Sequence, residues 1–254
     1  MALPAAALSE LEQAASRNGY PADPLEKGDW LLLRSPWTRH ELLATSDGSA
    51  FVVATRSSGV ATEAAREFPT WSGVLPANVV GAFSVVGSAA LHALINRLYR
   101  LALSLPPEPL LDFEEQVAGL PRETEAELLV VQRIGQDVFR KRLIDYWGGR
   151  CPITGIDQQE LLRASHIKAW ADCPTDAERL DIFNGLLLAA HVDAAFDAAL
   201  ITFADDGALI ISARLTEHSR TVLGLQDGLR LAGVTPRHAP YLAWHRRLFS
   251  QPPP

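Results

Sequence analysis

One segment of this sequence holds residues that could do acid–base or metal chemistry. His166 ends the short apolar run "LLRASH", and Lys168 follows two residues later. Asn184 precedes a second apolar run, "GLLLAA", and His191 and Asp193 come directly after it. A neutral imidazole can take a proton from water, and a carboxylate can hold a hard cation such as Mg²⁺. Taken singly, a strand histidine is more often a hydrogen-bonded core residue, and Asn before Gly is more often a turn.

The elements that must position these residues follow from local periodicity. The run "LLRASHI" predicts a strand, residues 170–182 a polar loop, "GLLLAA" a second strand and "HVDAAFDAAL" a short helix. The next segment, "LITFADDGALIIS", predicts a hairpin with its turn at 205–207. Upstream, residues 124–147 predict one helix, since Thr124 and Glu127 form a capping box and glycines follow its end.

Taken together, these motifs resemble a known family. The stretch "RCPITGIDQQELLRASHIKAWADC", followed by "ERLDIFNGLLLAAHVDAAFDAALITFADDG", is similar to the HNH endonuclease domain of bacterial restriction and defence nucleases. That domain is built on a ββα-metal finger. The upstream "RIGQDVFRKRLIDYWGGRCPITG" is similar to its lead-in helix, so the resemblance covers roughly the C-terminal half.

The resemblance implies roles for three positions. His166 would be the general base, Asn184 the residue that orients the site, and the third position falls at His191 or Asp193. The family's last histidine usually stands nine residues after the asparagine, which is Asp193 here, whereas His191 stands seven residues after it. We favour Asp193 as the metal ligand, with His191 as a second ligand or a phosphate contact, because a carboxylate suits Mg²⁺.

The sequence departs from the family beside the base. Many HNH sites have a metal-ligating Asp or His there, whereas this chain has Ser165, whose hydroxyl is a poorer ligand. Two alternatives stay open: the metal depends more on Asp193 and water, or another carboxylate, Asp172 or Asp197, contributes. The expected cofactor is a divalent metal, Mg²⁺ first, with Mn²⁺ and Ni²⁺ as alternatives.

Basic residues near the base suit a phosphate. Residues 131–170 contain seven Lys and Arg against four Asp and Glu, in a chain whose formal net charge is −7. We expect Arg163 and Lys168 to hold the scissile phosphate and Arg140 to make a more distant backbone contact. A solvated helix face is the commoner meaning of such a basic run. For Trp170 we prefer packing beneath the loop over stacking on DNA.

Composition bounds the class of protein. The chain has 254 residues, 48% apolar and 21% charged, which is typical of a globular protein. No apolar run reaches membrane-spanning length, and the first residues predict an amphipathic helix rather than a signal peptide, so we expect a cytoplasmic protein. Two cysteines, Cys151 and Cys173, are too few for a four-cysteine zinc knuckle and are interpreted as buried packing residues.

The first part of the chain is expected to form a separate domain. We predict an α+β protein, with a small N-terminal α+β domain of unknown specificity at 1–108, a linker at 109–121 and the HNH domain at 122–254. Short strands are expected at 30–34 and 50–54 and a helix at 84–104. Three tryptophans, Trp30, Trp37 and Trp71, either line a pocket for a flipped base or signalling ligand, or form this domain's core.

Two functions follow as hypotheses. The first is a metal-dependent DNA endonuclease of bacterial restriction or phage defence, in which the N-terminal domain selects or regulates and His166 activates water. The alternative is a non-catalytic DNA-binding or interaction module on a degenerate HNH scaffold. DNA is the expected partner in both, and a homodimer stays open because many double-strand cutters use one site per strand.

Overall fold

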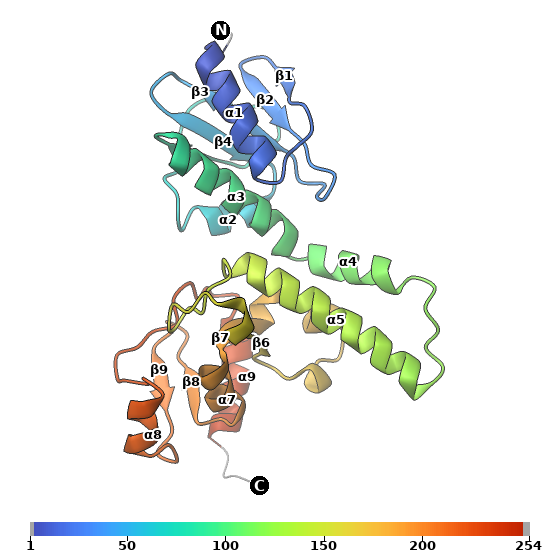
Figure 1. Cartoon of the computed structure of the whole chain (residues 1–254), viewed down its shortest axis with the longest axis vertical. Helices are drawn as coiled ribbons and strands as arrows, with labels where there is room; N and C mark the ends of the chain where they lie inside the picture. Colours follow the sequence, from blue (N-terminus) through green and yellow to red (C-terminus); the bar gives the residue numbers. More distant parts are fainter. Residues whose placement is uncertain (1–2, 251–254) are drawn as a thin grey trace. The chain divides into compact units, whose positions relative to one another are not determined.

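The chain forms two compact units, Met1–Leu105 and Pro106–Pro254 (Figure 1). The computed structural model describes residues 3–250. Both units contain helices and strands, so the predicted α+β class is confirmed. Within residues 3–250, no helix is both long and apolar enough to cross a lipid bilayer.

Unit 1 is an antiparallel sheet with helices packed on it. The sheet order is β1-β2-β3-β4-β5, where the strands are β1 (Leu25–Lys27), β2 (Trp30–Leu33), β3 (Leu42–Ser46), β4 (Phe51–Thr55) and β5 (Gly81–Val85). Its helices are α1 (Ala5–Arg17), α2 (Ser58–Ala64) and α3 (Ser88–Ser104). The predicted strands correspond to β2 and β4. The predicted helix at 84–104 begins later, at Ser88, because residues 81–85 pair with β4 instead.

Both faces of this sheet are covered, which explains the apolar runs of β2 and β4. Helices α1 and α3 pack on the sheet. On the opposite face lies a cluster of five buried strand residues, against which Trp30, Trp71 and Val79 pack. The rings of Trp30 and Trp71 meet edge to face with centroids 5.8 Å apart. These two tryptophans therefore belong to the core.

Unit 2 begins with a helical hairpin where the sequence predicted a linker. Helix α4 (Glu108–Val117) occupies most of residues 109–121 and packs against α5 (Glu125–Tyr146). Two apolar residues one turn apart, Phe113 and Val117, are buried, and Asp112 forms a 2.7 Å ion pair with Arg142 of α5. The preceding prolines were interpreted as a linker, although proline is also favoured in the first turn of a helix. The predicted capping box of α5 is confirmed.

The rest of unit 2 contains the predicted strand, strand and helix. Strand β6 (Leu162–His166) pairs antiparallel with β7 (Gly185–Ala189), and α7 (Ala190–Asp197) follows directly. The predicted polar loop between the strands contains three short helices: η2 (Trp170–Asp172), α6 (Asp176–Arg179) and η3 (Ile182–Asn184). The predicted hairpin is β8 (Ile201–Phe203) with β9 (Leu209–Ile211). The remaining helices are η1 (Gln159–Leu161), α8 (Glu217–Val222) and α9 (Ala239–Phe249).

Candidate functional site

The imidazole of His166 lies on the face of β6 that packs against α5. It stacks on the ring of Phe139, with centroids 3.7 Å apart and planes 13° apart, and it meets the edge of Trp170 at 5.6 Å. Its Nε2 is 2.8 Å from the carbonyl oxygen of Arg179. The stacking contact, the edge-to-face contact and this hydrogen bond together fix the orientation of the ring.

This hydrogen bond decides which ring nitrogen of His166 can accept a proton. A carbonyl oxygen only accepts hydrogen bonds, so Nε2 must carry the hydrogen and Nδ1 the lone pair. Burial lowers the pKa of His166 to about 4, and the bond to the Arg179 carbonyl opposes this only in part. The imidazole is therefore neutral at pH 7. Nδ1 has no hydrogen-bond partner within residues 3–250 and is not among the fully buried unpaired atoms.

Asn184 braces the loop that carries the Arg179 carbonyl. Its side chain is completely buried. Its Oδ1 accepts a hydrogen bond from the backbone N–H of Lys168 at 2.8 Å, and its Nδ2 donates to the carbonyl oxygens of Lys168 at 3.1 Å and Glu178 at 3.3 Å. One amide thus ties the end of β6 to α6. It fixes the peptide unit next to the one that holds His166.

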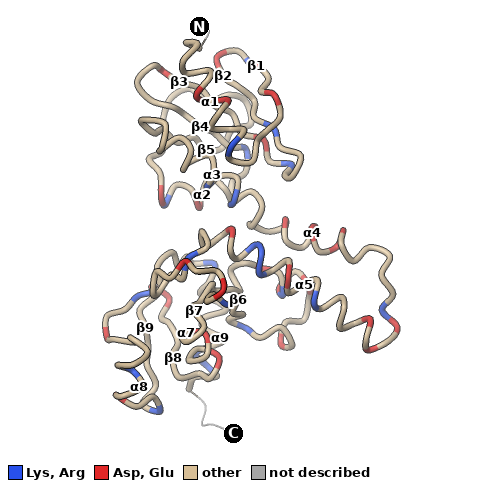
Figure 2. The backbone as a smooth tube through the Cα atoms, in the orientation of Figure 1, with Lys and Arg blue, Asp and Glu red and all other residues tan. Residues whose placement is uncertain are grey.

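The basic side chains that were expected to hold phosphate make contacts within the chain. Lys168 forms a 2.6 Å ion pair with Glu178. The guanidinium of Arg140 donates to the carbonyl oxygens of Leu162 at 3.0 Å and Gln159 at 3.1 Å. Basic and acidic residues are interspersed along α5 (Figure 2). Phosphate contacts by Lys168 and Arg140 would therefore compete with these bonds.

Arg163 makes hydrogen bonds to backbone carbonyl oxygens and no ion pair within residues 3–250. It is exposed, and its Nη1 donates to the carbonyl oxygens of Glu160 and Leu162, both at 3.1 Å. Its other guanidinium nitrogens make no hydrogen bond to any described residue. Of the three predicted phosphate contacts, Arg163 is the one best able to meet a phosphate without losing an ion pair.

On the opposite face of β6, the Ser165 hydroxyl lies near two carboxylates of α7. Successive residues of a strand point to opposite faces, so Ser165 faces α7 whereas His166 faces α5. The Oγ of Ser165 is buried and makes no hydrogen bond of ordinary geometry. It nevertheless lies close enough to Asp197 to lower the pKa of that carboxyl, while burial and the charge of Asp193 raise it more strongly. Asp193 and Asp197 stand one turn apart on α7, on the same side of the helix.

Helix geometry separates the two residues proposed for the third position. His191 precedes Asp193 by two residues, which is a rotation of about 200° around the helix. Asp193 therefore shares a face with Asp197, and His191 does not. Of the two further carboxylates considered from the sequence, Asp197 lies beside Ser165, whereas Asp172 lies in η2, within the loop between the strands.

The chemistry of this group suits a hard divalent cation. Within residues 3–250 no three His, Cys, Asp or Glu side chains gather as a metal-binding group. The oxygen donors beside α7 are two carboxylates that repel each other and one buried hydroxyl without a partner. A cation such as Mg²⁺ takes oxygen ligands and keeps several waters, so it would relieve both the repulsion and the unpaired hydroxyl.

Sequence reasoning missed several residues that build the site. Phe139 and Arg179 contact His166 but carry no local motif. Gly185 was predicted to begin the second strand, but nothing in the sequence indicated why a glycine is needed there. A Cβ at this position would lie 2.5 Å from the ring of Phe139, so β7 needs a glycine beneath α5. Tyr241, 60 residues further on, donates a 3.0 Å hydrogen bond to Asp181, which caps η3.

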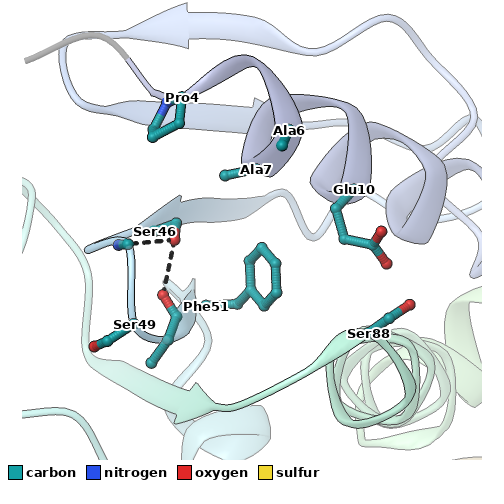
Figure 3. A pocket seen from close by; sticks show the side chains of 10 residues that line it. Pro4, Ala6, Ala7, Glu10, Ser46, Ser49, Phe51 and Ser88 are labelled. Carbon is teal, nitrogen blue, oxygen red and sulfur yellow. Dashed lines mark hydrogen bonds between the residues drawn. The ribbon is translucent and has the colours of Figure 1, made fainter.

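Unit 1 has a cavity of about 350 Å³ between α1, the β3–β4 turn and the start of α3 (Figure 3). Glu10 from α1 and Ser88 from α3 line it, both on the same side of the Phe51 ring in this view. The Oε1 of Glu10 is buried and has no hydrogen-bond partner. The Ser46 hydroxyl is satisfied by the carbonyl oxygen of Ala50 at 2.9 Å. No Lys or Arg lines this cavity, so it does not suit a phosphate.

Comparison with known proteins identifies part of unit 2. Residues 151–204 match the family model described as HNH endonuclease, which confirms the resemblance inferred from the sequence. The matched segment contains β6, β7 and α7. It therefore includes the candidate base and its positioning residue, His166 and Asn184, and the candidate metal ligands, Ser165, Asp193 and Asp197. No curated protein matches the chain. HNH nucleases generally use a divalent metal and act on DNA.

Proposed function

We propose that this protein is a metal-dependent DNA endonuclease that hydrolyses phosphodiester bonds with the β6–β7–α7 unit. The observation that carries the proposal is the group formed by Ser165, Asp193 and Asp197 inside the segment that matches HNH endonucleases. A hard divalent cation such as Mg²⁺ prefers oxygen ligands, and the group supplies three of them. A divalent cation held there would neutralise charge on the phosphoryl and leaving-group oxygens.

His166 is the general base in this proposal. Its neutral imidazole has a lone pair on Nδ1, and the hydrogen bond from Nε2 to the Arg179 carbonyl holds the ring in that tautomer. Because Ser165 and His166 leave β6 on opposite faces, the scissile phosphate must lie across the end of the strand, where His166 is the last residue. Asn184 acts as a positioning residue, since it fixes the loop that bears this carbonyl.

The biological setting that we infer is bacterial restriction or phage defence. Support for it comes from the resemblance of the sequence motifs to nucleases of that kind and from the presence of a second compact unit that could select the substrate. This setting predicts protection against phage. Phages should form fewer plaques on bacteria that make the protein than on bacteria that make the Asp197→Asn variant. Plaque counts on matched cultures test this, and equal counts would remove the defence role without touching the nuclease.

Plasmid nicking is the direct test. Purified full-length protein is incubated with supercoiled DNA, methylated and unmethylated, in Mg²⁺, Mn²⁺, Ni²⁺ or EDTA. We expect cleavage in at least one metal and none in EDTA. The Asp197→Asn variant should lose at least about a hundredfold in rate, because a metal ligand is removed. The control is Asp227→Asn, at a carboxylate whose side chain is 89% exposed and pairs with Arg220.

A second candidate function has its own observation in support. Among the described residues, two carboxylates of α7 and one hydroxyl of β6 form the candidate ligand group, and Lys168 and Arg140 are engaged within the chain. These features favour a DNA-binding module on a degenerate scaffold. The two functions differ in metal binding: a live site predicts that millimolar Mg²⁺ or Mn²⁺ raises the melting temperature of the parent but not that of Asp197→Asn. DNA binding without cleavage and without that shift would establish the module instead.

A further inference from the structure

Trp37 is exposed where the other tryptophans are not. Its relative exposure is 62%, whereas the remaining five tryptophans, all within the described residues, are partly buried. Burial of a tryptophan is strongly favourable because its side chain has a large apolar area. Unit 1 buries Trp30 and Trp71 in its core but leaves Trp37 outside it.

The loop that carries Trp37 is held in one conformation. It connects β2 to β3, and two short side-chain turns fix it: the Trp37 N–H donates to Ser35 Oγ, and the His40 N–H donates to Thr38 Oγ1, both at 3.1 Å. The hydroxyl of the buried Tyr20 donates to the His40 carbonyl oxygen at 3.2 Å. The indole is therefore presented to solvent by an ordered loop.

The chain neighbours of Trp37, Pro36 and Thr38, line a cavity that also contains two arginines. Its volume is about 550 Å³, and Arg34, Arg39, Ser35 and Thr38 are among the residues that line it. Within residues 3–250 the Nε of Arg34 is buried and has no hydrogen-bond partner, and the hydrogen bond from Nη2 to the Asp23 carbonyl oxygen is long, 3.4 Å.

The acidic residue in this lining is already neutralised. Glu41 also lines the cavity, and Arg56 forms a 3.1 Å ion pair with it. An unsatisfied buried guanidinium N–H favours a ligand that brings an acceptor, and an anion most of all. The cavity in Figure 3 has the opposite character, since a carboxylate lines it and no basic residue does.

We propose that the β2–β3 loop binds an unpaired nucleotide of a DNA strand, with the phosphate at Arg34 and the base stacked on Trp37. Stacking on an aromatic side chain together with phosphate contacts by basic residues is how proteins bind single strands. Apart from Pro36, the residues within two positions of Trp37 are polar or basic: Ser35, Thr38 and Arg39. An indole that anchors a protein partner usually lies within an apolar patch. The proposal rests on the proposed function, because it takes DNA as the substrate.

Binding is measured on the full-length protein without cleavage. Tryptophan fluorescence is followed in EDTA during titration with a single-stranded oligothymidylate, with a blunt duplex and thymidine monophosphate in parallel. We expect the oligonucleotide to quench the parent, and the Trp37→Ala variant to lose most of this quenching and about tenfold in affinity. The matched control is Val86→Ala, which removes another exposed apolar side chain of unit 1, 75% exposed.

The phosphate contact has a separate readout. The Arg34→Gln variant should bind the oligonucleotide several-fold more weakly, and the slope of log affinity against log salt should fall by about 0.7, the value for one contact to a single strand. Arg66→Gln is the control, because Arg66 lies on the same unit and pairs with Glu63. Equal salt slopes for Arg34→Gln and the parent would show that Arg34 does not contact a phosphate.

The outcomes separate this proposal from the nuclease proposal. If Trp37→Ala and the parent bind the oligonucleotide equally, or if the blunt duplex quenches Trp37 as strongly as the single strand, the loop proposal is overturned, whatever the plasmid assay gives. Absence of any DNA binding overturns it as well. If the plasmid is never cut but Trp37 is quenched as expected, the loop proposal stands and the nuclease proposal fails.

Discussion

His166 and His245 have nearly the same surroundings in two parts of unit 2, yet they differ at one nitrogen. Each imidazole stacks on a phenylalanine, His166 on Phe139 at 3.7 Å and His245 on Phe196 at 3.8 Å. In each, Nε2 bonds a backbone carbonyl oxygen, and burial lowers the pKa to about 4. The Nδ1 of His245 is bonded to Thr202 at 2.9 Å, whereas the Nδ1 of His166 has no partner in the described part of the chain.

The difference shows what distinguishes a structural histidine from one available for chemistry. Stacking, burial and a depressed pKa are common to both, so none of these properties assigns a function. A histidine whose two nitrogens are both bonded inside the protein has no lone pair to offer a water molecule. His166 keeps such a lone pair, and this supports its assignment as the base.

The largest expected effect is on cleavage rate. His166→Ala should lower the single-turnover rate by about a hundredfold to ten-thousandfold while DNA binding is retained, because a general base contributes about this much. His245→Ala should leave the rate within about threefold of the parent. Rates are measured well below the melting temperature of each variant, with near-ultraviolet circular dichroism as the control for folding.

Two results would break the comparison. Equal rate losses in the two variants would mean that both act through the fold. A His166→Ala variant that cuts like the parent, beside an inactive Asp197→Asn, would leave the metal site intact and move the role of base to another group.

The next effect is on stability against acid, and it should be similar for the two histidines. Each has a pKa of about 4 in the folded protein and about 6.5 in the unfolded chain. Well above pH 6.5 the histidine is neutral in both the folded and the unfolded state, so its protonation does not change the folding free energy. As the pH falls toward 4, the unfolded chain takes up the proton first, and each histidine costs roughly 3 kcal/mol of folding free energy.

Urea denaturation of the parent and of His166→Gln and His245→Gln, at pH 7 and pH 4.5, measures this acid term. Each variant should lose less stability between the two pH values than the parent does. A parent and variant with the same pH dependence would show that the histidine concerned is not protected from protonation in the fold.

The smallest effect separates two hydroxyls. Thr202→Val leaves the Nδ1 of the buried His245 unpaired and should destabilise the protein by about 1–3 kcal/mol. Ser165→Ala removes a buried hydroxyl that makes no hydrogen bond of ordinary geometry within residues 3–250, so it should change the stability of the metal-free protein little. Thermal melts in EDTA test both, and the stabilisation by Mg²⁺ expected of the parent should shrink in Ser165→Ala alone.

Much of the fold could be predicted from the sequence because its signals are local. The capping box of Thr124 and Glu127, the apolar runs of β6 and β7 and the turn of the β8–β9 hairpin each depend on residues within a few positions of one another. Strand β5 and helix α4 were missed for the converse reason. Each is stabilised by a partner element, β4 and α5 respectively, that the local sequence does not specify.

The sequence by itself determined the types and order of the chemical groups: a histidine that ends one strand, an asparagine before the next, and acidic residues on the helix that follows. Only the tertiary structure decided how these groups meet. Strand alternation turned Ser165 toward Asp197 and His166 toward Phe139, and a carbonyl from the intervening loop selected the histidine tautomer. Hydrogen bonds and burial join residues that are distant in the chain, so residue spacing could not specify them.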